Sequence, residues 1–429
     1  MTGQKVLVVC LAATAAVLVV ALVVTTPWRP LPAVPGGSVA PDAARDFGVA
    51  EIARGRALAE QSRPPAYLSM ALSLVVSLLL GLTPLGARLV TAVARPLGGG
   101  WVWQVVLGGV ALLLIGRVVA LPFDARLEAV RRHHGLSVQS WGNWWLDVAK
   151  GFAMSTGLLV AVLVALFALV RHWPRAGWPI AAGAGALLVV ALSFLYPLVV
   201  EPAFNSFHRM PDGPLRTSLL ELAEKDGVPV DDVLVADASR RTTALNAYVS
   251  GFGSTRRIVV YDTTLNAASP REIELIVAHE LGHAKRHDVL HGTLIGAAGV
   301  AAGICLTGLA TTWRPLLRRA SADSAGDPRA LALLLAVVAV VVTVSGPVQM
   351  LVSRRLEARA DVHALDLTRD PEGFAAMQRR LALTNQANLT PNPVLHALFA
   401  SHPAAAQRIA LARDWAKLHG VPEPADLRP

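Results

Sequence analysis

Charged residues are scarce in this sequence, making up 16% of its 429 residues, whereas hydrophobic residues make up 54%. The mean hydropathy is +0.49. Soluble globular domains carry about 25% charged residues. The composition therefore excludes an ordinary soluble protein and predicts an integral membrane protein that is mostly α-helical.

Cysteine is nearly absent, with Cys10 and Cys305 both inside apolar stretches. Two such residues exclude a disulfide framework and a cysteine-based metal site. Acidic residues are also outnumbered, leaving a net charge of +9. In a membrane protein this excess is typical of Arg-rich cytoplasmic loops, so we expect the lipid bilayer as a partner and no nucleic acid.

Long apolar runs are abundant. Each is close to the roughly 20 residues that a helix needs to cross a bilayer. We expect the first run to be retained as an anchor, because only Lys5 precedes it and no small-residue cleavage site follows. The seven predicted spans are residues 6–24, 67–85, 101–121, 152–170, 178–200, 292–313 and 330–351.

Lysine and arginine gather in alternate loops, which predicts an outside N-terminus and an inside C-terminus. The loop 314–329 departs from this pattern, because its four arginines would lie outside. Within the chain, residues 27–44 read as an irregular linker, and 41–61 as a charged helix.

The polar region between the fifth and sixth spans predicts a small α+β unit at the membrane face. Residues 214–228 have helical periodicity, 231–239 alternate as a strand does, and 242–253 with 256–265 form an expected hairpin. A further helix should begin at Ser269, an N-cap followed by Pro270 and by Glu272 three positions after the cap.

That helix contains His279-Glu280-Leu281-Gly282-His283, the HExxH pattern. The spacing places both imidazoles on one helical face, where they can share one Zn²⁺. Glu280 can then reach a metal-bound water and act as general base.

A catalytic zinc site needs a third protein ligand. A metzincin would have glycine at 286 and histidine at 289, but the chain has Arg286 and Val289. Glu357, after the seventh span, is the candidate, and Asp361 one turn later could support a ligating histidine. Two spans separate Glu357 from His279, so both emerge on one side of the membrane.

Two alternatives stay open. Glu357 could be an ordinary charged residue at a membrane boundary, since arginines surround it. His287 and His291 continue the i, i+4 ladder, but no carboxylate cluster accompanies them. We therefore expect polar residues at a helix end, with His287 supporting the metal ligands, rather than a second metal.

The combined motifs resemble the type I CAAX prenyl protease family of membrane zinc metallopeptidases, over residues 40–415. The resemblance is carried by "HELGHAKRHD" (279–288), "SRRLEARAD" (353–361), "NAYVSGFGSTRRIVVYDTTL" (246–265), "EPAFNSFHRMPDGPLR" (201–216), "HHGLSVQSWGNWWLDVAKG" (133–151) and "SHPAAAQRIA" (401–410). It implies seven helices around a chamber, with zinc at its cytosolic end, and cleavage beside a prenylated cysteine.

Residue by residue, the resemblance implies His279, His283 and Glu357 as ligands of one Zn²⁺ and Glu280 as base. Asn246 and Ala247 fall on the strand that holds the substrate backbone. His402 resembles a histidine that stabilises the oxyanion.

We expect four parts. Residues 1–200 hold five spans, 201–291 form the metalloprotease unit with substrate strand and HExxH helix, 292–351 form a transmembrane hairpin, and 352–429 bring the third ligand and the late histidine.

The expected function is a zinc endopeptidase of membrane-associated or lipidated peptides and proteins. The Ala-, Arg- and Val-rich composition suggests a bacterial plasma membrane, with the zinc site facing the cytoplasm. One alternative is a quality-control protease like the heat-shock membrane peptidases, which have fewer spans. Another is a non-enzymatic metal-binding membrane protein or a transporter, although the apolar runs are nearly free of the ionisable residues that transport uses.

Overall fold

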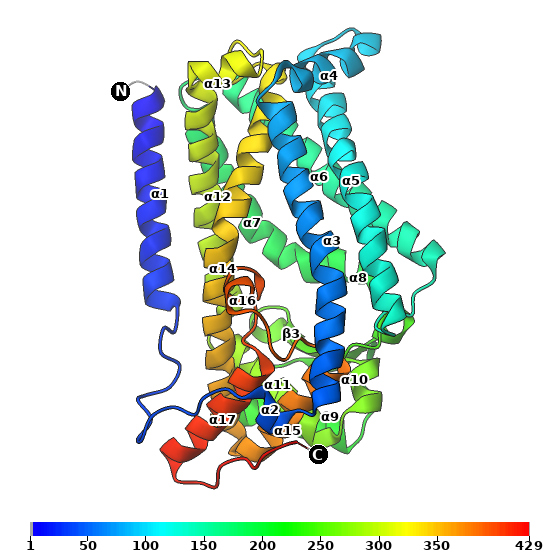
Figure 1. Cartoon of the computed structure of the whole chain (residues 1–429). Coiled ribbons are helices and arrows are strands. Elements are labelled where there is room, and N and C mark those ends of the chain that lie inside the picture. The colour runs from blue at the N-terminus through cyan, green and yellow to red at the C-terminus, as the bar shows by residue number, and fades with distance from the viewer. Residues whose placement is uncertain (1–2, 429) are drawn as a thin grey trace.

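Seven long apolar helices dominate the computed structural model, which describes residues 3–428 (Figure 1). In these residues the candidate spans are Gly3–Thr25, Val49–Gly81, Trp101–His133, Trp141–His172, Gly177–Phe204, Asp288–Thr312 and Pro328–Thr368. The N-terminal end lies opposite the C-terminus, as an odd number of spans requires. The prediction of a mostly α, seven-span membrane protein is confirmed.

All the spanning helices except α7 are longer than the apolar runs that predicted them. They are α1 (Gly3–Thr25), α3 (Val49–Gly81), α5 (Trp101–His133), α6 (Trp141–His172), α7 (Gly177–Leu195), α12 (Asp288–Thr312) and α14 (Leu331–Thr368). The charged helix predicted at 41–61 is continuous with the second span in α3, because Pro64 and Pro65 lie inside that helix without ending it. The long helices thus project polar ends beyond the membrane.

Shorter elements complete the far end and the membrane boundary. Helices α4 (Pro84–Ala94) and α13 (Arg314–Arg319) lie at the end opposite the C-terminus (Figure 1). After α7 the fifth span continues through a π turn (Tyr196–Val200) into α8 (Glu201–Phe204). At most 33% of any spanning window is buried, so most residues of these windows are not covered by other described parts of the chain.

A four-stranded sheet lies at the C-terminal end of the molecule. Its strands are β1 (Phe207–Arg209), β2 (Asp232–Ala236), β3 (Ala247–Ser250) and β4 (Arg257–Tyr261), in the order β1-β2-β4-β3. The predicted hairpin is confirmed, since β3 pairs antiparallel with β4, and β2 is parallel to β4. β1 was not predicted. The order leaves β3 at an edge.

The helices that share a core with this sheet come from both polar regions. They are α9 (Pro214–Asp226), α10 (Asp262–Ala267), α11 (Pro270–Lys285), α15 (Pro371–Thr384) and α17 (Ala405–His419), whereas α16 (Pro393–Phe399) packs on α14. One hydrophobic core joins Leu219, Ile258 and Leu275 with Phe374 and Trp415. The parts predicted as 201–291 and 352–429 therefore share a single core.

A buried ion pair ties the segment after the first span to this unit. Helix α2 (Ala43–Asp46) ends at Asp46, which is fully buried and binds the guanidinium of Arg413 from α17. Arg413 also donates to the carbonyls of Pro424 and Ala425. The pair therefore anchors the N-terminal linker and the C-terminal tail on α17.

We expect Asp46→Ala to destabilise the protein. Removing one partner of a buried ion pair costs about 3–5 kcal/mol. Because Arg413 would keep its two carbonyl acceptors, we expect a loss at the lower end, about 3 kcal/mol. Thermal unfolding in detergent should show a midpoint lower by several degrees. Asp426→Ala is the control, because Asp426 binds Arg45 at the surface with 63% of its side chain exposed. Equal midpoints for the two variants would contradict the prediction.

Candidate active site

Helix α11 presents the HExxH residues from a well-defined start. The Ser269 hydroxyl accepts from the Glu272 N–H, and the Glu272 carboxylate accepts from the Ser269 N–H at 2.8 Å. Pro270 occupies the first helical position, where its missing N–H costs nothing. The predicted helix and its cap are confirmed.

Helix α14 packs against α11 at Gly282, the glycine of the motif. A Cβ atom at this position would lie 3.0 Å from the Cβ of His363. Glycine therefore permits the close approach that brings Glu357 of α14 beside the histidines of α11. His363 in turn hydrogen-bonds the buried Asp226 at 2.9 Å, which fixes its ring.

Three side chains converge on one point. The Nε2 atoms of His279 and His283 are 3.2 Å apart, and the Glu357 carboxylate oxygens lie 3.3 Å from the first and 3.5 Å from the second. Nitrogen ligands about 2.0–2.1 Å from a tetrahedral zinc ion are roughly 3.3 Å apart. Oε2 of Glu357 is buried without a hydrogen-bond donor. The donor set and its spacing fit a metal ion of this size.

Carboxylates behind both histidines orient their rings. Nδ1 of His279 lies 2.9 Å from Asp361, and Nδ1 of His283 lies 2.8 Å from Asp288. Each Nδ1–H can donate to its carboxylate, which leaves both Nε2 lone pairs directed at the shared point. The structure thus brings Asp361 against His279, and its role in supporting a metal ligand stays a prediction.

Two further residues of this network were missed from the sequence. Asp288 lies five residues after His283, where α12 begins. Arg408 of α17 is bound to both oxygens of Asp361 and has its Nη2 4.0 Å from Glu357. The only signal for Arg408 was its place at the end of the "SHPAAAQRIA" segment.

The supporting role predicted for His287 is wrong. Its backbone has φ +54°, which turns the chain between α11 and α12, and its ring lies 3.4 Å from Arg256. That turn brings Asp288, rather than His287, against His283.

The electrostatic environment favours positive charge at the ligands. Burial lowers the pKa of His283, but Asp288 and Glu357 outweigh that effect and raise it to about 10. Asp361 and Glu357 likewise raise the pKa of His279 against the effect of burial. Burial raises the pKa of Glu280, which the two histidines oppose. The carboxylates that raise the pKa of the histidines, Asp288, Glu357 and Asp361, would also stabilise a divalent cation.

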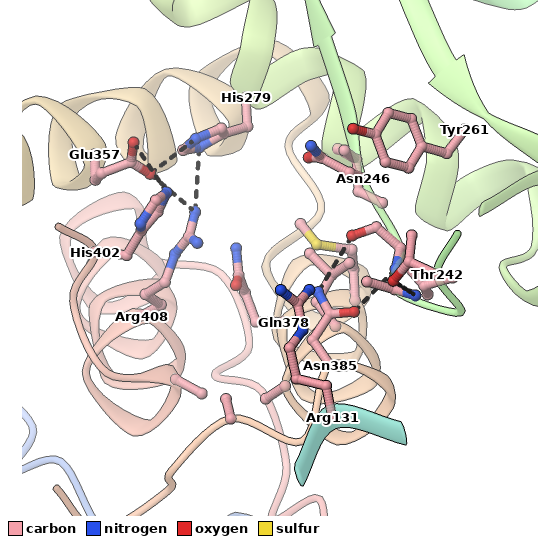
Figure 2. A pocket seen from close by; sticks show the side chains of 18 of the residues that line it. Arg131, Thr242, Asn246, Tyr261, His279, Glu357, Gln378, Asn385, His402 and Arg408 are labelled. Carbon is pink, nitrogen blue, oxygen red and sulfur yellow. Dashed lines mark hydrogen bonds and ion pairs between the residues drawn. The ribbon is translucent and has the colours of Figure 1, made fainter. Parts of the chain in front are cut away.

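A cavity of about 800 Å³ opens beside these residues. On one side Figure 2 shows His279, Glu357, His402 and Arg408, and on the other Arg131, Thr242 and Asn385. Nε2 of His402 lies 3.4 Å from Glu357, while its Nδ1 lies 2.8 Å from the Ser401 hydroxyl. The late histidine and Glu280 thus line the same cavity as His279 and Glu357.

The edge strand β3 borders this cavity. Asn246 lines it. The backbone C=O of Asn246 accepts from the N–H of Tyr261 and its N–H donates to the Thr264 hydroxyl, so the main chain of Asn246 faces β4, as it does in a hydrogen-bonded pair. Such pairs alternate along an antiparallel ladder. The N–H and C=O of Ala247 and Val249 therefore point away from β4, toward the open edge.

Comparison with known proteins agrees with this geometry. The profile of peptidase family M48 matches residues 210–416, and that of the CAAX prenyl protease N-terminal region with five membrane helices matches 64–206. The uncharacterized metalloprotease YhfN of Bacillus subtilis is 31% identical over 73% of this chain and 74% of its own. The chain belongs to peptidase family M48. It is a metalloendopeptidase and an integral membrane protein.

A further relative and a solved structure are similar over most of the chain. A CAAX prenyl protease 1 homolog from Oryza sativa is 28% identical over 71% of this chain and 72% of its own length. The crystal structure of S. mikatae Ste24p superposes with a TM-score of 0.74, covering 95% of this chain and 98% of that one at 18% identity. The M48 family implies a metal, generally zinc, which the donor set described above fits.

We expect Asp288→Asn to weaken metal binding by about 10–100-fold, because losing the carboxylate behind His283 reduces its basicity and its orientation. Competition with a chromophoric zinc chelator measures the affinity. Glu274→Gln is the control, since Glu274 lies on α11 but pairs with Arg271 rather than with a ligand. An unchanged affinity in Asp288→Asn would show that the carboxylate does not support the ligand.

Proposed function

We propose that the chain is a zinc endopeptidase in which His279, His283 and Glu357 hold one Zn²⁺. The observation that carries this proposal is the convergence of these side chains, since one donor atom from each of the three lies within 4.8 Å of the other two. Bound there, zinc supplies a Lewis acid that activates water and polarises the scissile carbonyl.

The protein's own groups would perform the proton transfers and hold the peptide. Glu280 lines the cavity next to His279, so its carboxylate can take the proton of the attacking water and return it to the leaving amine. His402, on the same cavity wall, is placed to donate a hydrogen bond to the developing oxyanion.

A substrate would bind as an extra strand at the edge of the sheet. The outward N–H and C=O of Ala247 can pair with its backbone, and the Asn246 side chain lies beside that position. Main-chain pairing aligns a scissile bond whatever its side chains are. This mode suits an enzyme that cleaves several sequences.

We further propose membrane-associated or lipidated, CAAX-type substrates. Relatives from Oryza sativa and Saccharomyces cerevisiae are named CAAX prenyl proteases. In this chain Phe252, just after β3, packs against Phe194 of the fifth span, with ring centroids 4.3 Å apart. The substrate edge thus leads directly to the membrane-spanning helices, where a lipid attached to the peptide could lie.

We expect Glu280→Gln to retain zinc and to lose cleavage of a fluorogenic peptide by about 10²–10⁴-fold, because the amide cannot accept the proton. Metal content and cleavage rate are measured on the same purified sample. Glu274→Gln, on the same helix and outside the cavity, should keep full activity. Full cleavage by zinc-loaded Glu280→Gln would overturn the proposed function.

The charge distribution supports a cytoplasmic zinc site, and from the Ala-, Arg- and Val-rich composition we propose a bacterial plasma membrane. The loops and tail on the side of α11 carry most of the lysine and arginine. A reporter enzyme that works only in the cytoplasm should therefore be active when it is fused to the C-terminus, and one that works only in the periplasm should be inactive there. A fusion in the loop 314–329, which is expected outside, is the control and should show the reverse pattern. Activity of the periplasmic reporter at the C-terminus would contradict the proposed orientation.

A further inference from the structure

The open edge of β3, where a substrate would pair, is closed at its N-terminal end by the side chain of Asn385. The carboxamide of Asn385 accepts from the N–H of Leu245 at 2.9 Å and donates to its C=O at 3.2 Å. Leu245 lies two residues before Ala247, so its main chain also points outward from the sheet. An incoming peptide can pair with Ala247 and Val249, but at Leu245 it must leave the edge.

The side-chain amide of Gln378 lies near the point where a bound peptide would turn away from the edge of β3. Gln378 of α15 is 3% exposed, lines the cavity, and its Nε2 has no hydrogen-bond partner. Figure 2 shows its side chain projecting between Arg408 and Asn385. A buried donor left unpaired costs about 1–3 kcal/mol, so a ligand oxygen at this point would be favoured.

The same end of the cavity holds an uncompensated cation. Among residues 3–428, no carboxylate lies within 4.0 Å of the guanidinium of Arg131. The other two arginines that line the cavity are paired, Arg241 with Asp147 and Arg408 with Asp361. Glu128, nearby in the lining, is held by Arg132 at 2.8 Å. Arg131 is therefore free to bind an anion.

The opposite end of the edge holds charges of both signs, because Arg257 faces Ser250 across the ladder and Glu201 lies beside Ser250. Ser250, the last residue of β3, donates from its hydroxyl to the Glu201 carboxylate at 3.3 Å. A peptide carboxylate would be attracted by Arg131, whereas at the Ser250 end the attraction by Arg257 is opposed by Glu201. A bound strand should thus run antiparallel to β3, with its C-terminal side toward Leu245 and Arg131.

We propose that Arg131 binds the free C-terminal carboxylate of the substrate, while Gln378 donates a hydrogen bond to a peptide oxygen between the scissile bond and that terminus. This inference rests on the proposed endopeptidase function and narrows it. The enzyme would cleave a short, fixed distance from the end of a chain, because Asn385 closes the edge and Arg131 holds the terminus.

The test compares two fluorogenic peptides of one sequence, one ending in a free acid and the other in an amide. Zinc-loaded full-length protein in detergent should cleave the acid with a kcat/KM about tenfold higher than that of the amide. A factor of this size corresponds to one hydrogen bond to a charged group. In Arg131→Gln the ratio of the two kcat/KM values should fall to about one. Arg126→Gln, an exposed arginine of the same helix outside the cavity, should keep the wild-type ratio.

Gln378 is tested with the same peptides. Gln378→Leu should lower kcat/KM for acid and amide alike, by about fivefold, since its partner is a peptide oxygen present in both. A series of acid peptides with increasing length after the scissile bond should show one preferred length in the wild type and a flattened profile in Arg131→Gln. Unchanged rates in Gln378→Leu would remove that residue from the inference.

Binding separates this inference from the proposed function. Fluorescence anisotropy with zinc-loaded Glu280→Gln measures affinity for both peptides, with and without Arg131→Gln. Cleavage of acid and amide at equal rates would overturn the role of Arg131 and leave the endopeptidase intact. Binding that prefers the acid through Arg131, with no cleavage by the wild type, would overturn the endopeptidase and leave the carboxylate site standing.

Discussion

Two hydrogen bonds, from His279 to Asp361 and from His283 to Asp288, determine what the rest of the site can do. Each one places the proton on Nδ1 and directs the opposite nitrogen toward Glu357. Without them the HExxH spacing would bring two rings together but would not fix which atoms face inward. Arg408 extends the network, because its guanidinium balances the charge of the buried Asp361.

These bonds also tie membrane helices to the polar unit. Asp361 and Glu357 lie on α14, which continues from the seventh span, and Asp288 begins α12, the sixth span. A metal site assembled in this way is positioned by the membrane helices as much as by the core around the sheet. The close packing at Gly282 makes the relation between α11 and α14 stiff.

The sequence predicted most of this arrangement where periodicity or spacing carried it. Apolar length located the spans, i, i+4 spacing paired His279 with His283, and the even number of intervening spans was consistent with Glu357 as their partner. What it could not locate depends on chain turns. Asp288 reaches His283 only because His287 adopts a left-handed backbone, and Arg408 reaches Asp361 only through the packing of α17. No periodicity encodes either contact.

The pairing of Asn385 with Leu245 has a consequence for the free protein. An exposed strand edge is a template on which another chain can add, and proteins commonly shorten or cover such edges to prevent aggregation. Here a side-chain amide ends the open part of β3 after a few residues. The edge therefore remains long enough to receive a peptide, yet too short to be a good starting point for sheet-to-sheet association between molecules.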